Sequence, residues 1–378
     1  MLQLPRVLSR RSALQRLALL AGATFSPWRV VGAEAKPETD ALGPLLPRRT
    51  LGQTGLKVTM LACGGSHIGR PSEATAQAVI EAAIERGVRV FDTAQLYQNG
   101  GSEERLGRYL TPKYRAQVLV FTKTMAEDAR TAREHLDGSL RRLKTDYLDL
   151  YYLHGPDPVA PIEETLRAYD DLVRQGKVRY VGVSNLFGWQ IAKAAGITAR
   201  LGLGALVAGQ YIYSPIHREL EREVIPSAVD SGIGITCYGV FGAGLLAGKY
   251  KGMTEPNQGS RMQIRMQMDG ARFWHPRGFR AAQAIEGVSE KTGIPMAKLA
   301  IGWPLGRKFV SSVVLGIRTR EQMLANLEAA DWDMPQDAWK AIEEQTRPEE
   351  DNLTWFNRQN YQRIFAVAEF HDERADLV

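Results

Sequence analysis

Residues 88–107, VRVFDTAQLYQNGGSEERLG, contain one complete passage from a strand to a helix. The apolar run VRVFDT (88–93) predicts a short buried strand, and the glycines and acids after it predict a turn and the start of a helix. Asp92 and Tyr97 stand five residues apart where this strand ends. The place of this unit in the fold therefore decides what the two side chains face.

The same unit recurs along the chain. Eight apolar runs each end in polar or glycine residues, and stretches such as SEATAQAVIEAAIERG (72–87) show the 3.6-residue apolar spacing of covering helices. Ends of successive runs at 92, 123, 154, 184, 210 and 238 lie 26 to 31 residues apart, close to the roughly 30 residues of a βαβ unit. The predicted strands are 58–65, 88–93, 118–123, 147–155, 178–185, 205–210, 233–239 and 310–316.

Eight even units predict an α/β fold, a (β/α)8 TIM barrel. The last step, from 238 to 316, is 78 residues long, so we expect an inserted loop after strand seven at the mouth of the barrel. An open doubly wound sheet is the alternative, but it does not explain eight units of such even length. We assign residues 48–378 to the barrel with a C-terminal helical tail.

Composition argues against a nucleic-acid partner. The chain has 378 residues and a formal charge of +6, with 44% hydrophobic residues. Residues 1–35 hold five arginines and one acid, so the remainder carries 43 basic and 41 acidic residues, a net charge of +2. No Lys/Arg-rich run with interleaved aromatics remains. Two cysteines, Cys63 and Cys237, are too few for a disulfide framework, and we interpret both as small buried apolar groups.

The first 35 residues have the pattern of an export signal. Arg10 and Arg11 precede an apolar stretch from Leu17 to Phe25, and residues 33–35 form an A-x-A cleavage site. The stretch is too short to span a bilayer, so we expect no stable membrane insertion. Paired arginines resemble the bacterial twin-arginine signal, which predicts contact with that export machinery and a periplasmic location. An ordinary amphipathic N-terminus is the alternative. Residues 36–47 are expected to be a proline-rich linker.

The barrel register brings four polar residues to one place. In such barrels the residues at the carboxyl ends of different strands converge on a single site. Asp92 ends strand two, Lys123 strand three and His154 strand four, while Tyr97 lies on the loop after strand two. We therefore expect these four side chains to face one small volume.

These four groups are suited to acid catalysis at a carbonyl. Tyrosine has a reference pKa near 10, and we expect the Lys123 ammonium, held by Asp92, to lower it. His154 is expected to donate a hydrogen bond to the carbonyl oxygen. No metal-ligand spacing and no serine or cysteine nucleophile accompanies them, so the reductant must be a bound hydride donor. The alternatives are a Schiff-base lysine at 123, a turn cap at 154 and a simple ion pair.

Six blocks of the chain resemble the aldo-keto reductase superfamily: FDTAQLYQNGGSEERLG, VFTKT, LDLYYLHGPDP, GKVRYVGVSN, GLLAGKY and GIRTREQMLANLEA. The similarity is greatest to the branch of potassium-channel β-subunits and bacterial sugar or aldehyde reductases, and it runs from about Arg48 to Ala330. The resemblance implies that Asp92, Tyr97, Lys123 and His154 form the catalytic tetrad, with Tyr97 as general acid/base. It also implies NADP(H) as the cofactor and a small-molecule carbonyl or sugar substrate.

The resemblance further assigns cofactor-binding residues. Its nicotinamide contacts fall on Ser184, Asn185, Gln210 and Tyr238. Barrels commonly bind phosphate after strands seven and eight, where this chain has Lys249, Gly316 and Arg318, and the planar donor fork of arginine suits a 2′-phosphate and so favours NADP over NAD. Gln322 and Asn326 match adenosine contacts, although Thr319 and Gln322 also fit a capping box. Arg261 resembles a further cofactor clamp.

Three departures from the family pattern affect this assignment. Gln98 stands where relatives have glycine after the tyrosine, Gly239 and Val240 replace a serine and a proline, and Ala325 replaces an acid. The tetrad is intact, but the usual pyrophosphate geometry is put in question.

The substrate side is less determined. Candidates for lining the pocket are His67, Phe187, Trp189, Tyr213 and Phe241, each of which is alternatively plain packing. Residues 250–279 are expected to be a lid or a passive surface loop. The leading function is an exported NADP(H)-dependent oxidoreductase. The alternatives are a cofactor-binding regulatory or partner protein and a Schiff-base aldolase, and the oligomeric state stays open.

Overall fold

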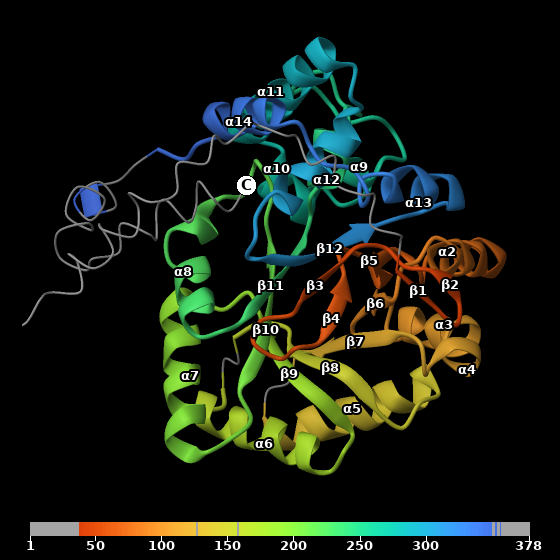
Figure 1. Cartoon of the computed structure of the whole chain (residues 1–378), viewed down its shortest axis with the longest axis vertical. Coiled ribbons are helices and arrows are strands. Elements are labelled where there is room, and N and C mark those ends of the chain that lie inside the picture. Colours follow the sequence, from red (N-terminus) through yellow and green to blue (C-terminus); the bar gives the residue numbers. More distant parts are fainter. Residues whose placement is uncertain (1–37, 126–127, 157–158, 350–351, 354–355, 357–378) are drawn as a thin grey trace, which may run out of the picture. The chain divides into compact units, whose positions relative to one another are not determined.

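Eight parallel strands form a closed barrel (Figure 1). The computed structural model describes residues 38–125, 128–156, 159–349, 352–353 and 356. Neighbouring barrel strands follow one another along the chain, and the last lies beside the first. The predicted (β/α)8 barrel is confirmed, and the open sheet is excluded. The barrel strands are β5 (Leu61–Gly64), β6 (Val90–Asp92), β7 (Leu119–Thr124), β8 (Leu148–Leu153), β9 (Val178–Ser184), β10 (Leu206–Ile212), β11 (Gly234–Tyr238) and β12 (Val310–Gly316).

Amphipathic helices cover the outside of the barrel. In α2 the Ser72 side chain accepts a hydrogen bond from the Thr75 amide and so caps the helix, and the buried face carries Val79 and Ile80. No helix in the described part of the chain is both long enough and apolar enough to cross a membrane. The helical elements are η1 (Gly65–His67), α2 (Glu73–Glu85), α3 (Gly101–Tyr109), α4 (Thr111–Tyr114), α5 (Ala129–Leu143), α6 (Ile162–Arg174), α7 (Gly188–Leu201), η2 (Glu219–Glu221), α8 (Val224–Asp230), η3 (Gly242–Ala247), α9 (Arg261–Ile264), η4 (Met266–Gly270), α10 (Ala271–Phe273), α11 (Pro276–Thr292), α12 (Met296–Leu305), α13 (Arg320–Leu327) and α14 (Gln336–Gln345).

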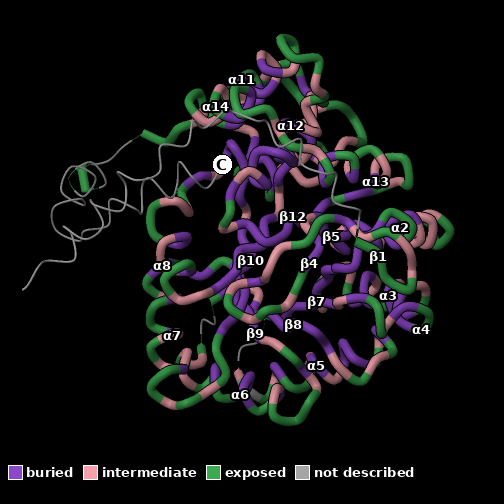
Figure 2. Tube along the Cα trace, in the orientation of Figure 1, coloured by how far each residue is buried: buried purple, intermediate pink, exposed green. Residues whose placement is uncertain are grey.

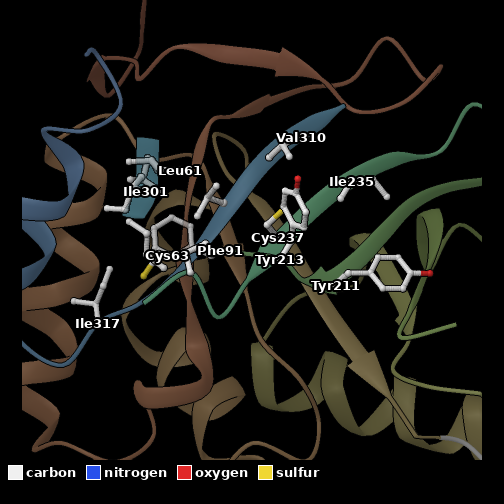
Figure 3. Packing of buried hydrophobic residues seen from close by; sticks show 14 of the residues in the cluster. Leu61, Cys63, Phe91, Tyr211, Tyr213, Ile235, Cys237, Ile301, Val310 and Ile317 are labelled. Atoms are coloured by element: carbon white, nitrogen blue, oxygen red, sulfur yellow. The ribbon is translucent and has the colours of Figure 1, made fainter. Parts of the chain in front are cut away.

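Alternate residues of each barrel strand pack into two different cores. Tyr151 of β8 belongs to the cluster between strands and helices, whereas Tyr152 belongs to the cluster inside the barrel. Figure 2 shows the strands buried along most of their length. Cys63 and Cys237 lie in the outer cluster, and burial raises the pKa of both thiols (Figure 3). The interpretation of both cysteines as buried apolar groups is confirmed.

An N-terminal hairpin closes one end of the barrel. The run predicted as a strand over 58–65 is divided in two, because Lys57–Thr59 (β4) pairs antiparallel with Arg48–Thr50 (β3) and only Leu61–Gly64 joins the barrel. Leu51 and Val58 of this hairpin are fully buried in the inner cluster.

The same hairpin is hydrogen-bonded to the segment that leads from α12 into β12. Arg49 donates from its guanidinium to the carbonyl oxygens of Leu305, Arg307 and Val310 at 2.6 to 2.8 Å. In β12, Ser311 Oγ donates to Thr50 O at 3.0 Å. The hairpin is thus fixed to segments about 260 residues further along the chain.

The prediction that residues 36–47 form a linker is wrong for residues 38–47, which the structure describes. Two short strands, β1 (Thr39–Asp40) and β2 (Gly43–Pro44), pair antiparallel. Arg89 donates from Nε to Asp40 Oδ2 at 2.7 Å and from Nη2 to Oδ1 at 2.8 Å. Leu46 is buried, so this segment packs on the barrel instead of forming a tether. The predicted signal peptide, residues 1–35, lies outside the described residues.

The insertion after β11 is largely helical. It contains η3 and every element through α12, so two long helices, α11 and α12, take the place of most of the expected loop. Phe273 and Leu245 are buried against the outer cluster. Of the predicted C-terminal tail, residues 336–345 form α14, and most residues after 349 lie outside the described part.

Candidate active site

Lys123 and Asp92 form a buried ion pair at the carboxyl end of the barrel. Asp92 is the last residue of β6, and Lys123 is the penultimate residue of β7. Lys123 Nζ donates to Asp92 Oδ1 at 2.6 Å and to the Thr93 carbonyl oxygen at 2.7 Å. Both side chains are excluded from solvent, at 0% and 3% exposure. Adjacent parallel strands therefore bring these two predicted residues into direct contact.

The second Asp92 oxygen is bonded from across the barrel. Gln210 Nε2, on β10, donates to Asp92 Oδ2 at 2.8 Å. Gln210 was predicted as a cofactor contact, and here its amide also fixes the carboxylate that holds Lys123. The sequence did not reveal this link, because the two residues are 118 positions apart.

Tyr97 lies beside the ion pair and beside His154. The distance from Lys123 Nζ to the Tyr97 ring centroid is 5.4 Å. The rings of Tyr97 and His154 meet edge to face with their centroids 5.8 Å apart. The structure therefore brings the four predicted catalytic residues together.

The loop that carries Tyr97 has an unusual backbone. Gln98 and Asn99 both have φ of 52°, in the left-handed region that favours glycine, and Gly100 follows with φ of 92°. Gln98 Nε2 donates to the Ser66 carbonyl oxygen at 3.1 Å and so ties this loop to the one after β5. Gln98, the departure from the family's glycine, thus carries a contact that glycine cannot make.

The expectation that Lys123 lowers the pKa of Tyr97 is wrong in this structure. Burial raises the pKa of Tyr97, and the Asp92 carboxylate raises it further, while Arg261, Arg265 and Arg272 oppose this. The positive charge of Lys123 is paired with Asp92 at 2.6 Å, so it does not outweigh the effect of burial on the phenol. Tyr97 is therefore a neutral phenol near pH 7, which is the form that donates a proton.

His154 is also neutral. Burial, and then the charge of Lys123, lower the pKa of His154 to about 3. Its amide donates to Thr124 O at 2.9 Å and its carbonyl oxygen accepts from Asn185 Nδ2 at 2.9 Å, so the backbone is held on both sides. Its ring atom Nδ1 is buried and has no hydrogen-bond partner among the described residues. A neutral imidazole placed this way can form a hydrogen bond with an incoming oxygen.

The residues predicted to hold the nicotinamide end lie together. Ser184 Oγ donates to the Gln210 carbonyl oxygen at 2.8 Å, and Asn185 Nδ2 donates to Ser184 Oγ at 2.9 Å. The Tyr238 hydroxyl donates to Asn185 Oδ1 at 3.0 Å. Asn185 has φ of 59°, which asparagine tolerates better than most residues. The half-buried Tyr238 ring is thereby fixed at the rim.

The residues predicted for the phosphate end follow β11 and β12. Lys249 and Arg318 are exposed there, and Gln322 and Asn326 are half-buried on α13. Gln322 Oε1 accepts from the Arg318 amide at 3.0 Å, and the Gln322 amide donates to Thr319 Oγ1 at 3.3 Å. In this structure Gln322 therefore acts as in the capping-box alternative, except that its side chain accepts from the amide of residue 318 instead of that of residue 319.

A buried histidine and an arginine meet beside Gly316. Arg261 Nη1 donates to His67 Nε2 at 2.8 Å, and Arg261 Nε donates to Asp269 Oδ2 at 2.8 Å. A Cβ at Gly316 would stand 3.1 Å from His67 Nε2, so glycine leaves room for this pair. His67 is 4% exposed and hydrogen-bonded to Arg261, which favours the alternative of plain packing for this pocket candidate.

Asp269 is a partner that the sequence reading missed. It is fully buried on the short helix η4, and it pairs with Arg261 and, at 3.6 Å, with Arg265. The four-residue spacing of 261, 265 and 269 is the sequence signal for this cluster, although the three residues lie on two successive short helical segments and the residue between them. The inserted segment is thereby joined to the barrel at His67.

The donors at this end of the mouth fit an anionic dinucleotide. Burial, and then the charges of Arg261, Arg318 and two further arginines, lower the pKa of His67 to about 3. Several cations therefore surround this corner, next to a glycine that permits close approach. Tyr238, among the residues predicted to hold the nicotinamide end, offers a flat, partly exposed ring. Phosphate groups match the arginines around His67, and a planar ring matches Tyr238.

Two of the remaining pocket candidates are at the rim. Phe187 and Trp189 are 64% and 60% exposed, after β9. Tyr213 is not at the rim, because it is fully buried against Trp303 and its hydroxyl donates to Glu221 Oε1 at 2.8 Å (Figure 3). Its prediction as a pocket residue is wrong. Phe241 is half-buried and packs on the outer cluster.

A separate cavity of about 430 Å³ lies away from these residues. It opens at the amino-terminal ends of β9 and β10, between α6 and the N-terminal hairpin, and its walls include Leu166, Tyr180 and Leu206. It contains none of the predicted catalytic or cofactor residues.

Comparison with known proteins gives consistent similarities. The sequence model described as "Aldo/keto reductase family" matches residues 60–347. The chain is 31% identical over 302 residues to the uncharacterized oxidoreductase YrpG of Bacillus subtilis, covering 74% of this chain and 90% of that one. It is 30% identical over 309 residues to a putative voltage-gated potassium channel subunit beta of Schizosaccharomyces pombe, covering 76% and 89%. It is 30% identical over 325 residues to the aldo-keto reductase AMT2 of Alternaria alternata, covering 74% and 86%.

Proposed function

The chain belongs to the aldo/keto reductase family of carbonyl-reducing oxidoreductases, and from that membership we propose that it reduces an aldehyde, ketone or sugar carbonyl with NADP(H), or oxidises the corresponding alcohol. Tyr97 is the proton donor and acceptor in this proposal. The observation that carries it is the buried Asp92–Lys123 pair beside the Tyr97 and His154 rings.

Tyr97 supplies the proton that the carbonyl oxygen takes up. Because burial and Asp92 raise the pKa of Tyr97, its hydroxyl holds a proton near pH 7 and gives it only to a stronger base, such as an oxygen gaining negative charge. Lys123 lies 5.4 Å from the ring centroid and stabilises the phenolate that remains. Asp92 and the Thr93 carbonyl oxygen hold Lys123 in place.

His154 orients the substrate oxygen. It is neutral, with a pKa of about 3, so it adds no charge that would compete with Lys123. A hydrogen bond from its ring to the carbonyl oxygen fixes that oxygen near the Tyr97 hydroxyl. The edge-to-face contact of the two rings keeps the two side chains next to each other.

The proposed cofactor is NADP(H), which supplies a hydride to the carbonyl carbon when bound. Ser184, Asn185 and Gln210 would hold its carboxamide, and Tyr238 would pack against the ring. Lys249, Gly316, Arg318, Gln322 and Asn326, with Arg261, would hold its phosphates and adenosine. The exposed guanidinium of Arg318 supports a preference for the 2′-phosphate of NADP.

Replacing Tyr97 with phenylalanine tests this proposal. We expect NADPH oxidation with a panel of aldehydes, ketones and sugars to fall by roughly 10²- to 10⁴-fold in kcat, since proton transfer contributes about that much. The control is Tyr211→Phe, which removes the hydroxyl of a buried tyrosine in the outer cluster and is expected to retain activity. Full turnover of every accepted substrate by Tyr97→Phe would refute the proposal.

A second candidate is a cofactor-binding regulatory protein with little turnover. The similarity to proteins named as potassium channel β-subunits favours it. It predicts no NADPH consumption on the same panel by the wild type, together with recovery of a stoichiometric partner after crosslinking in cells. Wild-type turnover that depends on Tyr97 would exclude it.

We also propose export through the twin-arginine route to the periplasm. The support is the pair Arg10 and Arg11 ahead of an apolar stretch and an A-x-A site at residues 33–35. Replacing both arginines with lysine is expected to leave the full-length chain in the cytoplasmic fraction. A wild-type chain that keeps residues 1–35 in the cytoplasm would contradict this proposal.

A further inference from the structure

A second tyrosine lies inside the barrel, beside the Asp92–Lys123 pair. Tyr152, on β8, pairs in register with Lys123 on β7, and its side chain belongs to the inner cluster. Its ring centroid lies 5.7 Å from Lys123 Nζ, and the face of an aromatic ring attracts an ammonium within about 6 Å. The rings of Tyr97 and Tyr152 therefore lie at similar distances from the same ammonium.

The barrel interior leaves room for the Tyr152 ring at a glycine. Gly182, on β9, pairs in register with Tyr152, and Ala208 on β10 follows in the same layer. A Cβ on Gly182 would stand 2.6 Å from the Tyr152 Cδ1 and Cε1 atoms, which is closer than nonbonded carbon atoms approach. A large side chain is thus packed next to a position without a side chain and a position with a small one. This packing fixes the place of the ring beside Lys123.

The Tyr152 hydroxyl reaches across the barrel interior to β11. It forms a hydrogen bond with Thr236 Oγ1, with the two oxygens 3.2 Å apart. Thr236 pairs in register with Gln210 on β10, and the Gln210 side chain is a second hydrogen-bond partner of the Tyr152 hydroxyl. Burial raises the pKa of Tyr152 above its ordinary value, so the hydroxyl keeps its proton near pH 7.

Gln210 connects this hydroxyl to the buried ion pair. Gln210 Nε2 donates to Asp92 Oδ2 at 2.8 Å, and Lys123 Nζ donates to Asp92 Oδ1 at 2.6 Å. A continuous network of polar contacts, here called the inner network, therefore contains Thr236, Tyr152, Gln210, Asp92 and Lys123. Each of them is at most 3% exposed. Because water does not reach such groups to replace a lost partner, the position of each depends on its neighbours.

We propose that Tyr152 is a positioning residue for carbonyl reduction, which holds Lys123 and Gln210 in place through the inner network. This inference rests on the proposed carbonyl-reducing function. The ring limits the movement of the Lys123 ammonium, and the hydroxyl keeps the Gln210 amide directed at Asp92. Tyr152 contacts neither substrate nor cofactor in this proposal. Its effect on the rate comes from the fixed place of the positive charge that stabilises the Tyr97 phenolate.

Replacing Tyr152 with phenylalanine removes the hydroxyl and keeps the ring. With the carbonyl turned over fastest on the panel used for Tyr97→Phe, we expect kcat to fall by about 5-fold, the factor that one ordinary hydrogen bond carries. The Kd of NADPH, from fluorescence titration, and KM for the carbonyl should stay within about 2-fold of wild type, because the lost bond acts on the transition state.

The neighbouring tyrosine provides a matched control. Tyr151 is also fully buried, and its hydroxyl donates to the Ala132 carbonyl oxygen at 3.3 Å, but it faces the outer cluster. Tyr151→Phe should lower stability in urea unfolding about as much as Tyr152→Phe does, and it should leave kcat unchanged. A loss of kcat confined to Tyr152→Phe therefore separates positioning from the general effect of removing a buried hydroxyl.

Thr236→Val tests the next member of the inner network. Valine has nearly the shape of threonine but lacks the hydroxyl, so we expect kcat to fall by about 2- to 5-fold in the wild-type background. In the Tyr152→Phe background the same replacement should have no further effect, because the bond that it removes is already broken. Such a lack of additivity is the result expected for residues that act through one network.

The outcomes separate this inference from the function on which it rests. An unchanged kcat in Tyr152→Phe, an equal loss of kcat in Tyr151→Phe, or independent effects of Tyr152→Phe and Thr236→Val would overturn the inference, while Tyr97-dependent turnover still supports the function. A raised Kd for NADPH with unchanged kcat would assign Tyr152 to cofactor binding and would also overturn it. If Tyr152→Phe does not fold, an unchanged kcat in Thr236→Val has the same consequence. Absence of turnover on every carbonyl would overturn the function and the inference together.

Discussion

Replacing Asp92 with asparagine tests whether Lys123 depends on this carboxylate. The two side chains are 3% and 0% exposed, and Nζ lies 2.6 Å from Oδ1. Removing one partner of a buried pair costs about 3–5 kcal/mol, because the other charge is left in surroundings of low polarity. We therefore expect Asp92→Asn to lower the free energy of unfolding by about 3–5 kcal/mol at pH 7.

The loss depends on pH because Lys123 can release its proton. Burial already lowers the pKa of Lys123, and Asp92 opposes this. Removing Asp92 leaves the effect of burial unopposed, so in the variant the folded-state pKa of Lys123 falls further below its unfolded value of about 10.4. Between these two pKa values the unfolded chain binds one more proton than the folded chain, so stability rises with pH. The variant should therefore regain stability as the pH rises toward about 10.

Urea unfolding followed by circular dichroism from pH 7 to pH 9.5 measures this effect. The double variant Asp92→Asn/Lys123→Met carries no buried charge, so its stability should lose the added pH slope. Asp149→Asn is the matched control: Asp149 is 1% exposed, and its partners Arg115 and Arg179, which are 13% and 55% exposed, are arginines that stay charged over this pH range. A loss below about 1 kcal/mol for Asp92→Asn, or a slope equal to that of wild type, would refute the reasoning.

Three further predictions concern the loops and the N-terminal segment. Gln98→Ala keeps a non-glycine residue at φ of 52° and loses the bond to Ser66 O, so by urea unfolding it should be about 1 kcal/mol less stable than Gln98→Gly, which relieves the backbone; equal stabilities would contradict this. Arg318→Ala should raise KM for NADPH by about 10-fold or more and leave KM for NADH unchanged in steady-state kinetics; equal effects on both would remove the assigned 2′-phosphate role. Asp40→Ala should cost about 1 kcal/mol, because Asp40 is partly exposed and Arg89 keeps its hydrogen bonds to the Ile84 and Val88 carbonyl oxygens. Because the Arg89 hydrogen bond lowers the pKa of Asp40, this contribution is present above about pH 4 and is lost as pH falls, so wild type and variant should converge in acid unfolding.

The barrel could be predicted because its signal is local and repeated. Each strand is a short apolar run followed by a covering helix, and even spacing fixes the parallel order. The hairpin of β3 and β4 was missed because residues 58–65 were interpreted as one continuous strand. In the structure the chain bends at Met60, between β4 and β5. Pairing of residues 48–50 with 57–59 is a tertiary choice that an apolar run does not reveal.

The site was predictable in position but not in electrostatics. Asp92, Lys123 and His154 meet because barrel strands end on one face. The pKa of Tyr97 depends instead on burial and on which charge Asp92 neutralises, and neither follows from spacing. The hydrogen bond between His67 and Arg261 was not foreseen for a similar reason, since the two residues are 194 positions apart in the chain.

The bonds from Arg49 and Ser311 across the hairpin bear on how the chain matures. The hairpin of residues 48–59 cannot form these bonds until residues 305–311 have been synthesised, because its partners lie late in the chain. Contacts of such long sequence separation slow folding. A nascent chain halted before β12 would expose two unpaired strand edges, on β11 and β5, and such edges invite aggregation.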